Sequence, residues 1–162
     1  MIPNPIGFEK HDHSHCVQDA VAAADKKCRN AGVQLTPVRK RALEILLEEH
    51  RALGAYDVLA RLNEDGYGSQ PPVAYRALDF LTKHGFVHKI ERLNAFVACA
   101  HPGERHTPAF LICTECHVVA EAETEHSDSL MGQIAETTGF RITRAVLEAE
   151  GICPNCLAKE TA

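Results

Sequence analysis

Two pairs of closely spaced cysteines are the strongest chemical signal in the sequence. Cys113 and Cys116 are separated by two residues, and so are Cys153 and Cys156. A two-residue spacer allows one tight turn to direct both thiolates at the same ion, and zinc prefers four such ligands in a tetrahedron. We therefore predict that the four sulfurs hold one structural zinc ion, with residues 117–152 folding so that the two turns meet.

The alternative for these cysteines is two separate redox sites like those of thioredoxin-like proteins. A redox Cys-x-x-Cys motif normally occurs once, at the start of a helix that follows a strand, whereas this chain has two copies. The chain also has seven cysteines in 162 residues, and a cytosolic protein rarely keeps disulfides. Metal binding is therefore the favoured interpretation.

His88 and Cys99 form a second candidate group. Residues 86–91 and 95–99 have the pattern of two short strands that form a hairpin. If Leu93 and Asn94 form a two-residue turn, His88 lies directly opposite Cys99, and opposed side chains have Cβ atoms about 5 Å apart. This register would suit two ligands of one ion. Taken singly, Cys99 is more simply interpreted as a core residue and His88 as a surface residue.

Aromatic and basic residues in the first half of the chain indicate contact with DNA. Tyr75 and Arg76 lie one turn into a helix that begins near residue 71. Arginine is the usual bidentate partner of guanine, and tyrosine can contact a thymine methyl group or a phosphate. Four residues are candidate phosphate contacts, namely Arg39, Lys40, Arg41 and Arg61. The alternative is an ordinary solvated helix face.

The elements that must position these groups follow from hydrophobic spacing and from helix-start and helix-stop residues. Helices are predicted over residues 17–31, from Pro37 with Thr36 as its N-cap, over residues 55–62, and from Pro71 to before Gly85. Helices followed by a β-hairpin are typical of a winged-helix domain. The helix that precedes the hairpin would then enter the major groove.

The second half of the chain has the pattern of a small α/β domain. Strands are predicted over residues 109–113, 118–121 and 140–149, with a helix over residues 127–138. The predicted fold class is therefore α+β, a winged-helix DNA-binding domain followed by a small C-terminal α/β domain. Its parts would be a flexible His-rich tail (1–15), the winged helix (16–99), a linker or hinge (100–108) and the zinc-stapled domain (109–162).

Composition is consistent with a folded protein of the cytoplasm. Hydrophobic residues make up 45% of the chain and charged residues 24%, and no apolar run approaches the roughly 20 residues that a membrane helix needs. We expect no membrane partner and no export signal. The net charge of −5 arises from residues 101–162, while residues 1–100 are close to neutral, so a local basic stripe could still meet phosphate.

Four motifs occur in an order that points to a known family. They are Leu35-Thr36-Pro37-Val38-Arg39, Ala55-Tyr56-Asp57, Tyr75-Arg76-Ala77-Leu78-Asp79-Phe80-Leu81 and Gly85-Phe86-Val87-His88-Lys89-Ile90-Glu91. In this order they resemble the ferric uptake regulator family, and within it the zinc uptake regulator branch. One departure is Val73-Ala74, where the family usually has Thr-Val before Tyr-Arg, so that Ser69 or Gln70 would have to cap the helix instead.

The resemblance implies a zinc-responsive repressor of zinc-uptake genes that binds double-stranded operator DNA when zinc is replete. It implies a homodimer formed through the C-terminal domain, and about two zinc ions per protomer, one structural and one regulatory. It maps the regulatory site onto His88, Cys99, His106 and Glu121, and it adds Tyr56 to the candidate DNA contacts. One thiolate, two imidazoles and one carboxylate favour zinc over iron or manganese.

Three alternatives stay open. The chain could be a sibling sensor of iron, manganese, nickel or peroxide, against which Cys99 argues. It could be an interaction module that zinc stabilises and that binds no DNA. An enzyme, such as a zinc hydrolase or deaminase, is disfavoured because the usual catalytic zinc motifs are missing and a four-cysteine site leaves no coordination position for water.

Overall fold

The computed structural model describes residues 13–49, 51–102, 106–124 and 130–160. The chain divides into two compact units, an N-terminal unit of residues 9–103 and a C-terminal unit of residues 104–162 together with 1–8. The division falls inside the predicted linker of residues 100–108. Each unit is described below by itself.

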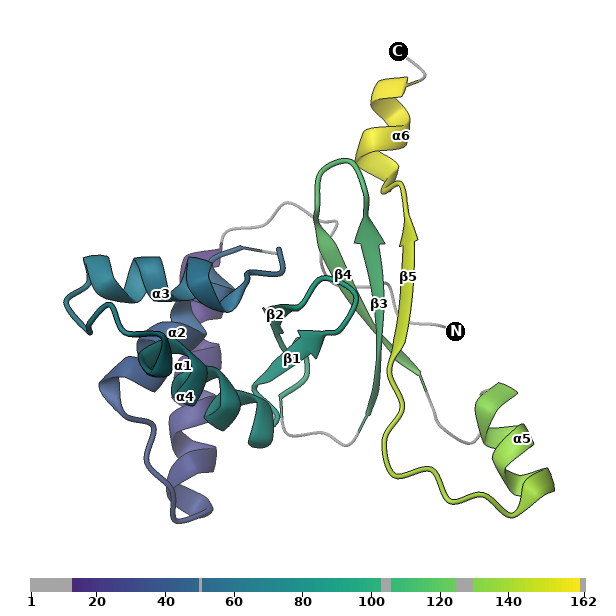
Figure 1. Ribbon diagram of the computed structural model, residues 1–162, viewed down its shortest axis with the longest axis horizontal. Coiled ribbons are helices and arrows are strands. Elements are labelled where there is room, and N and C mark those ends of the chain that lie inside the picture. Colours follow the sequence, from purple (N-terminus) through teal and green to yellow (C-terminus); the bar gives the residue numbers. More distant parts are fainter. Residues whose placement is uncertain (1–12, 50, 103–105, 125–129, 161–162) are drawn as a thin grey trace. The chain divides into compact units, whose positions relative to one another are not determined.

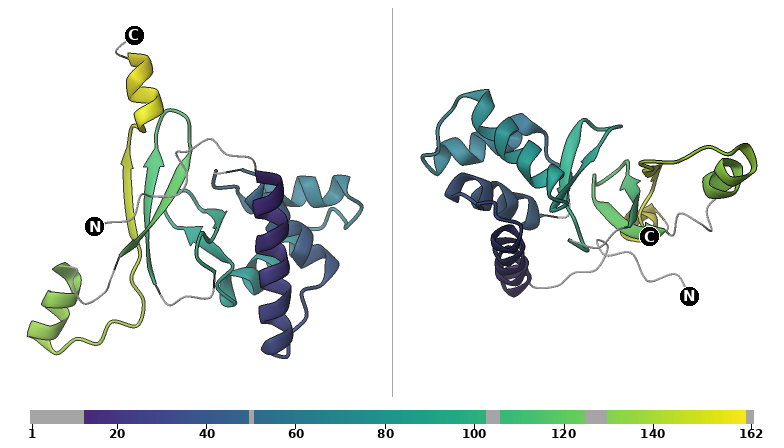
Figure 2. Two further views of the ribbon diagram at one scale, coloured as in Figure 1. Left: turned by 180° about the vertical axis from the view of Figure 1, so that it is seen from behind. Right: turned by 90° about the horizontal axis from the view of Figure 1, so that it is seen from below.

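Four helices form most of the N-terminal unit, as predicted. They are α1 (His13–Asn30), α2 (Pro37–Leu47), α3 (Ala55–Glu64) and α4 (Pro71–Lys83). Their buried faces form one apolar core, and Figures 1 and 2 show the helices gathered into one group beside a β-hairpin.

Helix ends follow the start and stop residues of the sequence. Thr36 is extended and Pro37 opens α2, but the Thr36 side chain makes no capping hydrogen bond. Gln70, one of the two residues suggested to replace the missing hydroxyl, occupies the N-cap position of α4, but its side chain makes no capping hydrogen bond either. Gly32 and Gly85 both have positive φ angles, of 70° and 76°, beyond the ends of α1 and α4.

Helix α1 begins at His13, earlier than the predicted start at Val17. The predicted flexible tail of residues 1–15 therefore overlaps the first turn of α1, and its residues 1–12 lie outside the described part of the chain. Val21, Ala24 and Cys28 lie on one helical face and are buried, which explains why α1 packs on the core.

The hairpin consists of β1 (Val87–Ile90) and β2 (Ala95–Ala98), and the predicted register is wrong. His88 pairs with Val97 rather than with Cys99. Residues 91–94 form a four-residue turn in place of the expected two-residue turn, and Asn94 adopts a positive φ of 46° in it. A longer turn moves every pair by two positions, so His88 and Cys99 remain on the same face as diagonal neighbours.

Leu53 forms an isolated antiparallel β-bridge with Phe96 of the hairpin. Its backbone N–H donates to the Phe96 carbonyl at 2.9 Å, and the Phe96 N–H donates back at 2.8 Å. This bridge ties the residues that lead into α3 to β2. The amino end of α3, the outer side of α4 and the hairpin are thereby held on one side of the N-terminal unit.

A three-stranded sheet forms the centre of the C-terminal unit. Its order is β4 (Val119–Thr124), β3 (Thr107–Cys113) and β5 (Leu147–Gly151), with β4 antiparallel and β5 parallel to β3. Helices α5 (Leu130–Thr138) and α6 (Pro154–Glu160) complete the unit. Phe110, Ile112, Val119 and Ala120 form its buried apolar centre.

Several elements of this unit differ from prediction, and β3 begins at Thr107, inside the predicted linker of residues 100–108. The strand predicted over residues 140–149 begins only at Leu147, because β5 finds a partner only along residues 109–113 of β3. Helix α6 was not predicted, although Pro154 is a common first helical residue. The described residues include no helix with both the length and the hydropathy needed to cross a bilayer.

Candidate metal centre and nucleic-acid interface

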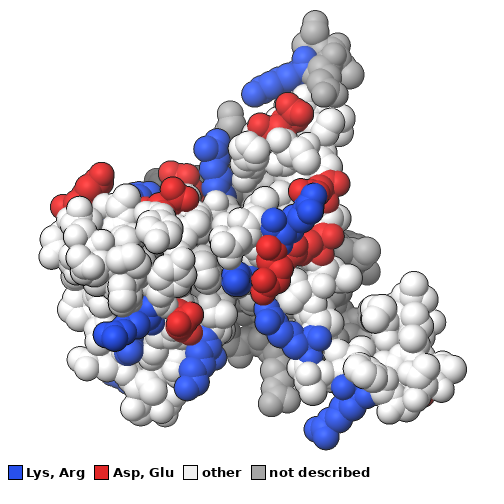
Figure 3. Space-filling model, in the orientation of Figure 1, with Lys and Arg blue, Asp and Glu red and all other residues white. Residues whose placement is uncertain are grey.

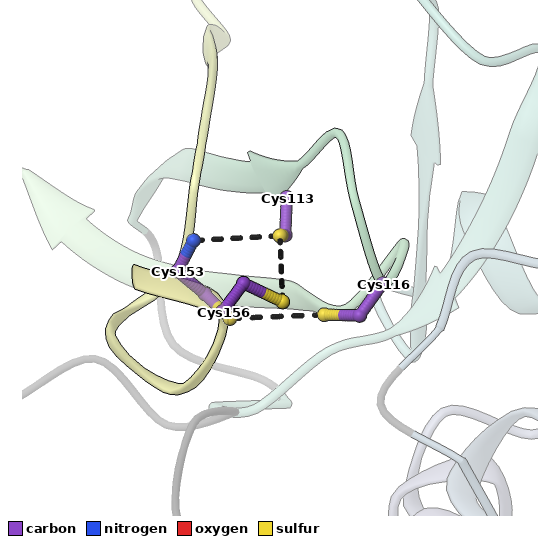
Figure 4. A group of neighbouring side chains, drawn as sticks. All are labelled: Cys113, Cys116, Cys153 and Cys156. Carbon is purple, nitrogen blue, oxygen red and sulfur yellow. Dashed lines mark hydrogen bonds between the residues drawn. The ribbon is translucent and has the colours of Figure 1, made fainter. Parts of the chain in front are cut away.

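The four cysteine sulfurs of the C-terminal unit converge on one point (Figure 4). The Cys113 and Cys156 Sγ atoms lie 3.9 Å apart, and the Cys116 and Cys153 Sγ atoms lie 3.7 Å apart. A tetrahedral zinc ion with Zn–S bonds of about 2.3 Å requires sulfurs about 3.8 Å from one another. All seven cysteines of the chain are free of disulfide bonds, so these spacings fit a metal site.

Parallel pairing of β3 with β5 brings the two cysteine pairs together. Cys113 ends β3 opposite Gly151 at the end of β5, and Cys153 follows two residues later. The Thr114 backbone N–H donates to the Gly151 carbonyl at 2.8 Å, which joins the two turns directly. His117 has a positive φ of 61° and an exposed side chain, so it closes the first turn without joining the cluster.

The protonation states of two of these thiols differ because their hydrogen bonds differ. Backbone N–H groups, that of Cys116 foremost, lower the pKa of Cys113 to about 6. Hydrogen bonding with the Cys153 side chain, together with burial, raises the pKa of Cys156 to about 12. A zinc ion needs both as thiolates, so its binding at this centre must release protons.

His88 and Cys99 come together within the N-terminal unit. Their ligand atoms lie within 4.8 Å of each other, and Cys99 is buried while His88 is half-buried. The Cys99 backbone N–H donates to the Phe86 carbonyl at 2.9 Å, which extends the hairpin register past the end of β2. The pair is therefore built by the base of the hairpin.

His106 and Glu121 come together within the C-terminal unit. The His106 Nε2 atom lies 2.9 Å from Glu121 Oε1, and the two side chains are only 9% and 4% exposed. Glu121 lies on β4 opposite Phe110, a fully buried residue of β3. A buried carboxylate requires a partner, and an imidazole beside it forms a second pair of potential metal ligands.

The exposed side of α4 carries the residues predicted to read DNA. Tyr75 is 43% exposed, Arg76 is exposed, and Tyr75 stands edge-on to Tyr56 of α3 with ring centroids 6.5 Å apart. Tyr56 is itself 66% exposed. Large aromatic side chains are rarely so exposed without a partner, so this surface of α3 and α4 is suited to contact with a macromolecule.

The three basic residues of α2 have different surroundings. Arg41 bonds to Asp65 at 2.6 Å, to Glu48 at 2.8 Å and to Glu44 at 3.4 Å, and Asp65 and Glu48 raise its pKa further. Arg41 therefore links α2 to the end of α3, which leaves little of its charge for a phosphate. Lys40 is exposed and only 3.9 Å from Glu44, whereas Arg39 has no carboxylate partner among the described residues.

A cleft of about 530 Å³ lies between the start of α3, the outer side of α4 and the hairpin. Tyr56 and Tyr75 lie on one side of it, and Lys83 and Lys89 supply cations. Neither lysine was predicted as a site residue, although Lys89 directly follows His88 in the sequence. Figure 3 shows basic and acidic side chains interspersed on one face, rather than a continuous basic stripe there.

Comparison with known proteins decides the family. The model of the ferric uptake regulator family matches residues 30–150, which include most of the helices and all the strands described above except the end of β5. The chain belongs to the ferric uptake regulator family.

Relatives of this family member include zinc and iron regulators. The zinc uptake regulation protein of Escherichia coli (strain K12) is 39% identical over 144 residues, 88% of this chain and 84% of that protein. The ferric uptake regulation protein of Legionella pneumophila is 30% identical over 134 residues, 81% of this chain and 96% of that protein. A zinc uptake regulator complexed with zinc and DNA is similar in structure, with a TM-score of 0.85, 38% identity, and coverage of 90% of this chain and 98% of that one.

Proposed function

We propose that this ferric uptake regulator family member is a zinc-responsive repressor that binds operator DNA as a homodimer and controls zinc-uptake genes. The observation that carries the proposal is the similarity, over both units, to a zinc uptake regulator complexed with zinc and DNA. The donor chemistry of the two units supports it, because sulfur and imidazole ligands suit zinc better than iron or manganese.

The proposed structural zinc ion is held by Cys113, Cys116, Cys153 and Cys156. A closed four-thiolate site stabilises the fold and offers no open coordination position, so we expect no catalysis there. The proposed regulatory ion takes His88 and Cys99 from the N-terminal unit and His106 and Glu121 from the C-terminal unit. Each of these two pairs has its ligand atoms within bridging distance in its own unit, which supports the assignment.

Ligands drawn from both units explain how zinc would control DNA binding. An ion that all four ligands share would favour one orientation of the winged helix relative to the C-terminal unit. A two-fold dimer must present its two α4 helices one or more DNA turns apart, about 34 Å per turn. A population shift toward the matching orientation would therefore raise affinity for the operator.

Exposed apolar side chains support dimerisation through the C-terminal unit. Strand β5 is an edge strand of the sheet, and all but one of its residues are exposed. Leu130, Met131 and Ile134 of α5 are 71%, 55% and 47% exposed, and Phe140 is 69% exposed. A second copy of the chain would cover these residues, since obligate dimer interfaces are apolar at their centre.

For DNA, we propose that Tyr75 and Arg76 contact base edges, with Tyr56 beside them. Arg39 and Lys40 are the proposed phosphate contacts. Arg41 and Arg61, which the sequence predicted as phosphate contacts, are assigned instead to the ion pairs that join α2 to α3. A fragment of a zinc-uptake promoter from the same genome is the appropriate DNA probe.

Replacing Cys99 by Ser tests the regulatory site. We expect the Cys99→Ser variant to keep the fold and the four-cysteine ion. Its zinc content should decrease from about two ions per protomer to one, and it should lose zinc-dependent binding of the promoter fragment. Elemental analysis measures the zinc content, and fluorescence anisotropy at buffered free zinc measures binding of the promoter fragment. Cys28→Ser is the matched control, since Cys28 is also a buried cysteine of the N-terminal unit but packs in the helical core.

Wild-type binding by Cys99→Ser at the same free zinc would contradict the regulatory assignment. Stronger activation of DNA binding by iron(II) or manganese(II) than by zinc would favour a sibling sensor, for which the 30% identity to a ferric uptake regulation protein is the supporting observation. Binding whose affinity does not fall with salt would contradict phosphate contact altogether.

A further inference from the structure

Arg39 is held in a fixed place by two contacts. Its guanidinium carbon lies 3.7 Å from the centroid of the Phe80 ring, so the planar group stacks on the ring face. Its Nη1 atom donates to the Gln34 carbonyl at 2.7 Å. The first contact comes from α4 and the second from the residues before α2, so two separate segments set the position of one side chain.

The Phe80 ring is itself fixed. It packs against the apolar core of the N-terminal unit, and the His84 ring lies beside it with centroids 4.5 Å apart and planes inclined by 45°. A ring held by the core on one side and by a second ring can serve as a rigid platform. Stacking of a guanidinium on such a platform is a cation–π contact that also limits the rotamers of the arginine.

The remaining donors of Arg39 are available to an anion. A guanidinium has five N–H donors, and the Gln34 carbonyl takes one of them. No carboxylate contacts Arg39 or Arg76 among the described residues. Arg76 precedes Phe80 by four residues, so the two lie on one face of α4 in successive turns. Two guanidinium groups without acidic partners thus belong to adjacent parts of the proposed DNA-binding surface.

We propose that Phe80 is a positioning residue, which together with the Gln34 carbonyl presets Arg39 to bind a backbone phosphate of DNA. This inference rests on the proposed function. A flexible arginine loses rotamer freedom when it binds, and an arginine that is already ordered loses less, so the stack increases affinity without touching DNA. Phe80 should not affect which DNA sequence is preferred, because phosphate contacts position the protein and do not read bases.

The first test needs no DNA. Protons over the face of an aromatic ring are shielded, so the Arg39 side-chain N–H resonance of the zinc-loaded protein should lie upfield of its usual position. We expect Phe80→Leu to move it back downfield, and Phe80→Tyr to leave it upfield. A resonance that Phe80→Leu does not move would show that the stack does not exist in solution.

The second test is a double-mutant cycle on binding of the promoter fragment. We expect Phe80→Leu to weaken binding about three- to tenfold, the range of a cation–π contact. In an Arg39→Ala background the same change should have no further effect. Arg39→Lys, which keeps the charge but lacks the planar fork, should resemble Phe80→Leu, and Phe80→Tyr should bind like wild type.

Salt dependence separates positioning from loss of charge. Arg39→Ala removes one phosphate contact from each protomer, so it should reduce the slope of log affinity against log salt by about 1.8 for the dimer, whereas Phe80→Leu and Arg39→Lys should leave the slope unchanged. An effect of Phe80→Leu that adds fully to that of Arg39→Ala would indicate a merely structural role and overturn the inference. Failure of wild-type protein to bind the fragment would contradict the proposed function itself, whereas binding unaffected by Phe80→Leu contradicts only the positioning role.

Discussion

At the scale of single residues, chemical type alone does not distinguish the functional groups of this chain. Arg39 and Arg41 are two residues apart, yet Arg41 pairs with three carboxylates, whereas Arg39 pairs with none in the part of the chain that the structure describes. Among the cysteines, Cys28 packs in the helical core, Cys99 lies beside a histidine, and four others face one another. The role of each follows from its neighbours, because charge and metal affinity depend on what lies within a few ångströms.

Cys153→Ser should remove the structural zinc ion. A serine hydroxyl at neutral pH is a poor zinc ligand, and a structural zinc site contributes on the order of 10 kcal/mol to folding. We expect the variant to lose this zinc and to unfold in the C-terminal unit, as measured by zinc content and far-ultraviolet circular dichroism. Cys16→Ser, at an exposed position of α1, is the control that should change neither. Retention of zinc and of thermal stability by Cys153→Ser would contradict the structural site.

At the scale of elements, the joint between α4 and β1 matters most for the proposed function. Gly85 ends the helix with a φ of 76°, and the Phe86 N–H then donates to the Leu81 carbonyl at 2.9 Å. This reversal directs the chain from α4, the proposed DNA-reading helix, straight into the strand that carries His88. The element that would read DNA and the strand that would bind zinc are therefore consecutive, with only Gly85 and Phe86 between the helix cap and the strand.

Gly85→Ala should destabilise this joint by about 1 kcal/mol, because an L-residue pays that much for a left-handed conformation. A Cβ atom at this position would meet nothing within 4 Å, so the cost is conformational and not steric. Urea unfolding of the zinc-loaded protein measures it. Gly151→Ala is the control, because Gly151 also has open space around it but no positive φ. This change should lower the free energy of unfolding by less. Equal effects of the two changes would argue against the conformational explanation.

At the scale of the whole molecule, the two units have different surfaces. The N-terminal unit buries its apolar residues in one helical core and exposes tyrosines beside a cleft. The C-terminal unit leaves large apolar side chains exposed on α5 and on the edge strand β5. This division fits a protein in which one unit binds DNA and the other binds its own copy.

Ile134→Glu should yield monomers that keep the four-cysteine ion and bind promoter DNA at least tenfold more weakly, because a buried unpaired charge opposes association. Analytical ultracentrifugation and anisotropy measure the two effects. Leu93→Glu is the matched control, since Leu93 is an exposed leucine of the hairpin turn and should leave the dimer intact. Dimers of unchanged stability in Ile134→Glu would place the interface elsewhere.

Local patterns in the sequence sufficed for helices α1 to α5, for the pairing of cysteines within each turn and for the order of these elements, but not for α6. Helix start and stop residues and Cys-x-x-Cys turns depend on residues only a few positions apart, so their signals are local to the sequence. The sequence predicted the hairpin, but only the tertiary structure decided its register, in which His88 lies opposite Val97 across the turn at residues 91–94. The tertiary structure also decided that β5 pairs with β3 and begins where β3 offers a partner. It also decided that Arg41 pairs with Asp65 while Arg39 stacks on Phe80. These outcomes depend on which segments of the folded chain become neighbours, and local sequence patterns do not contain that information.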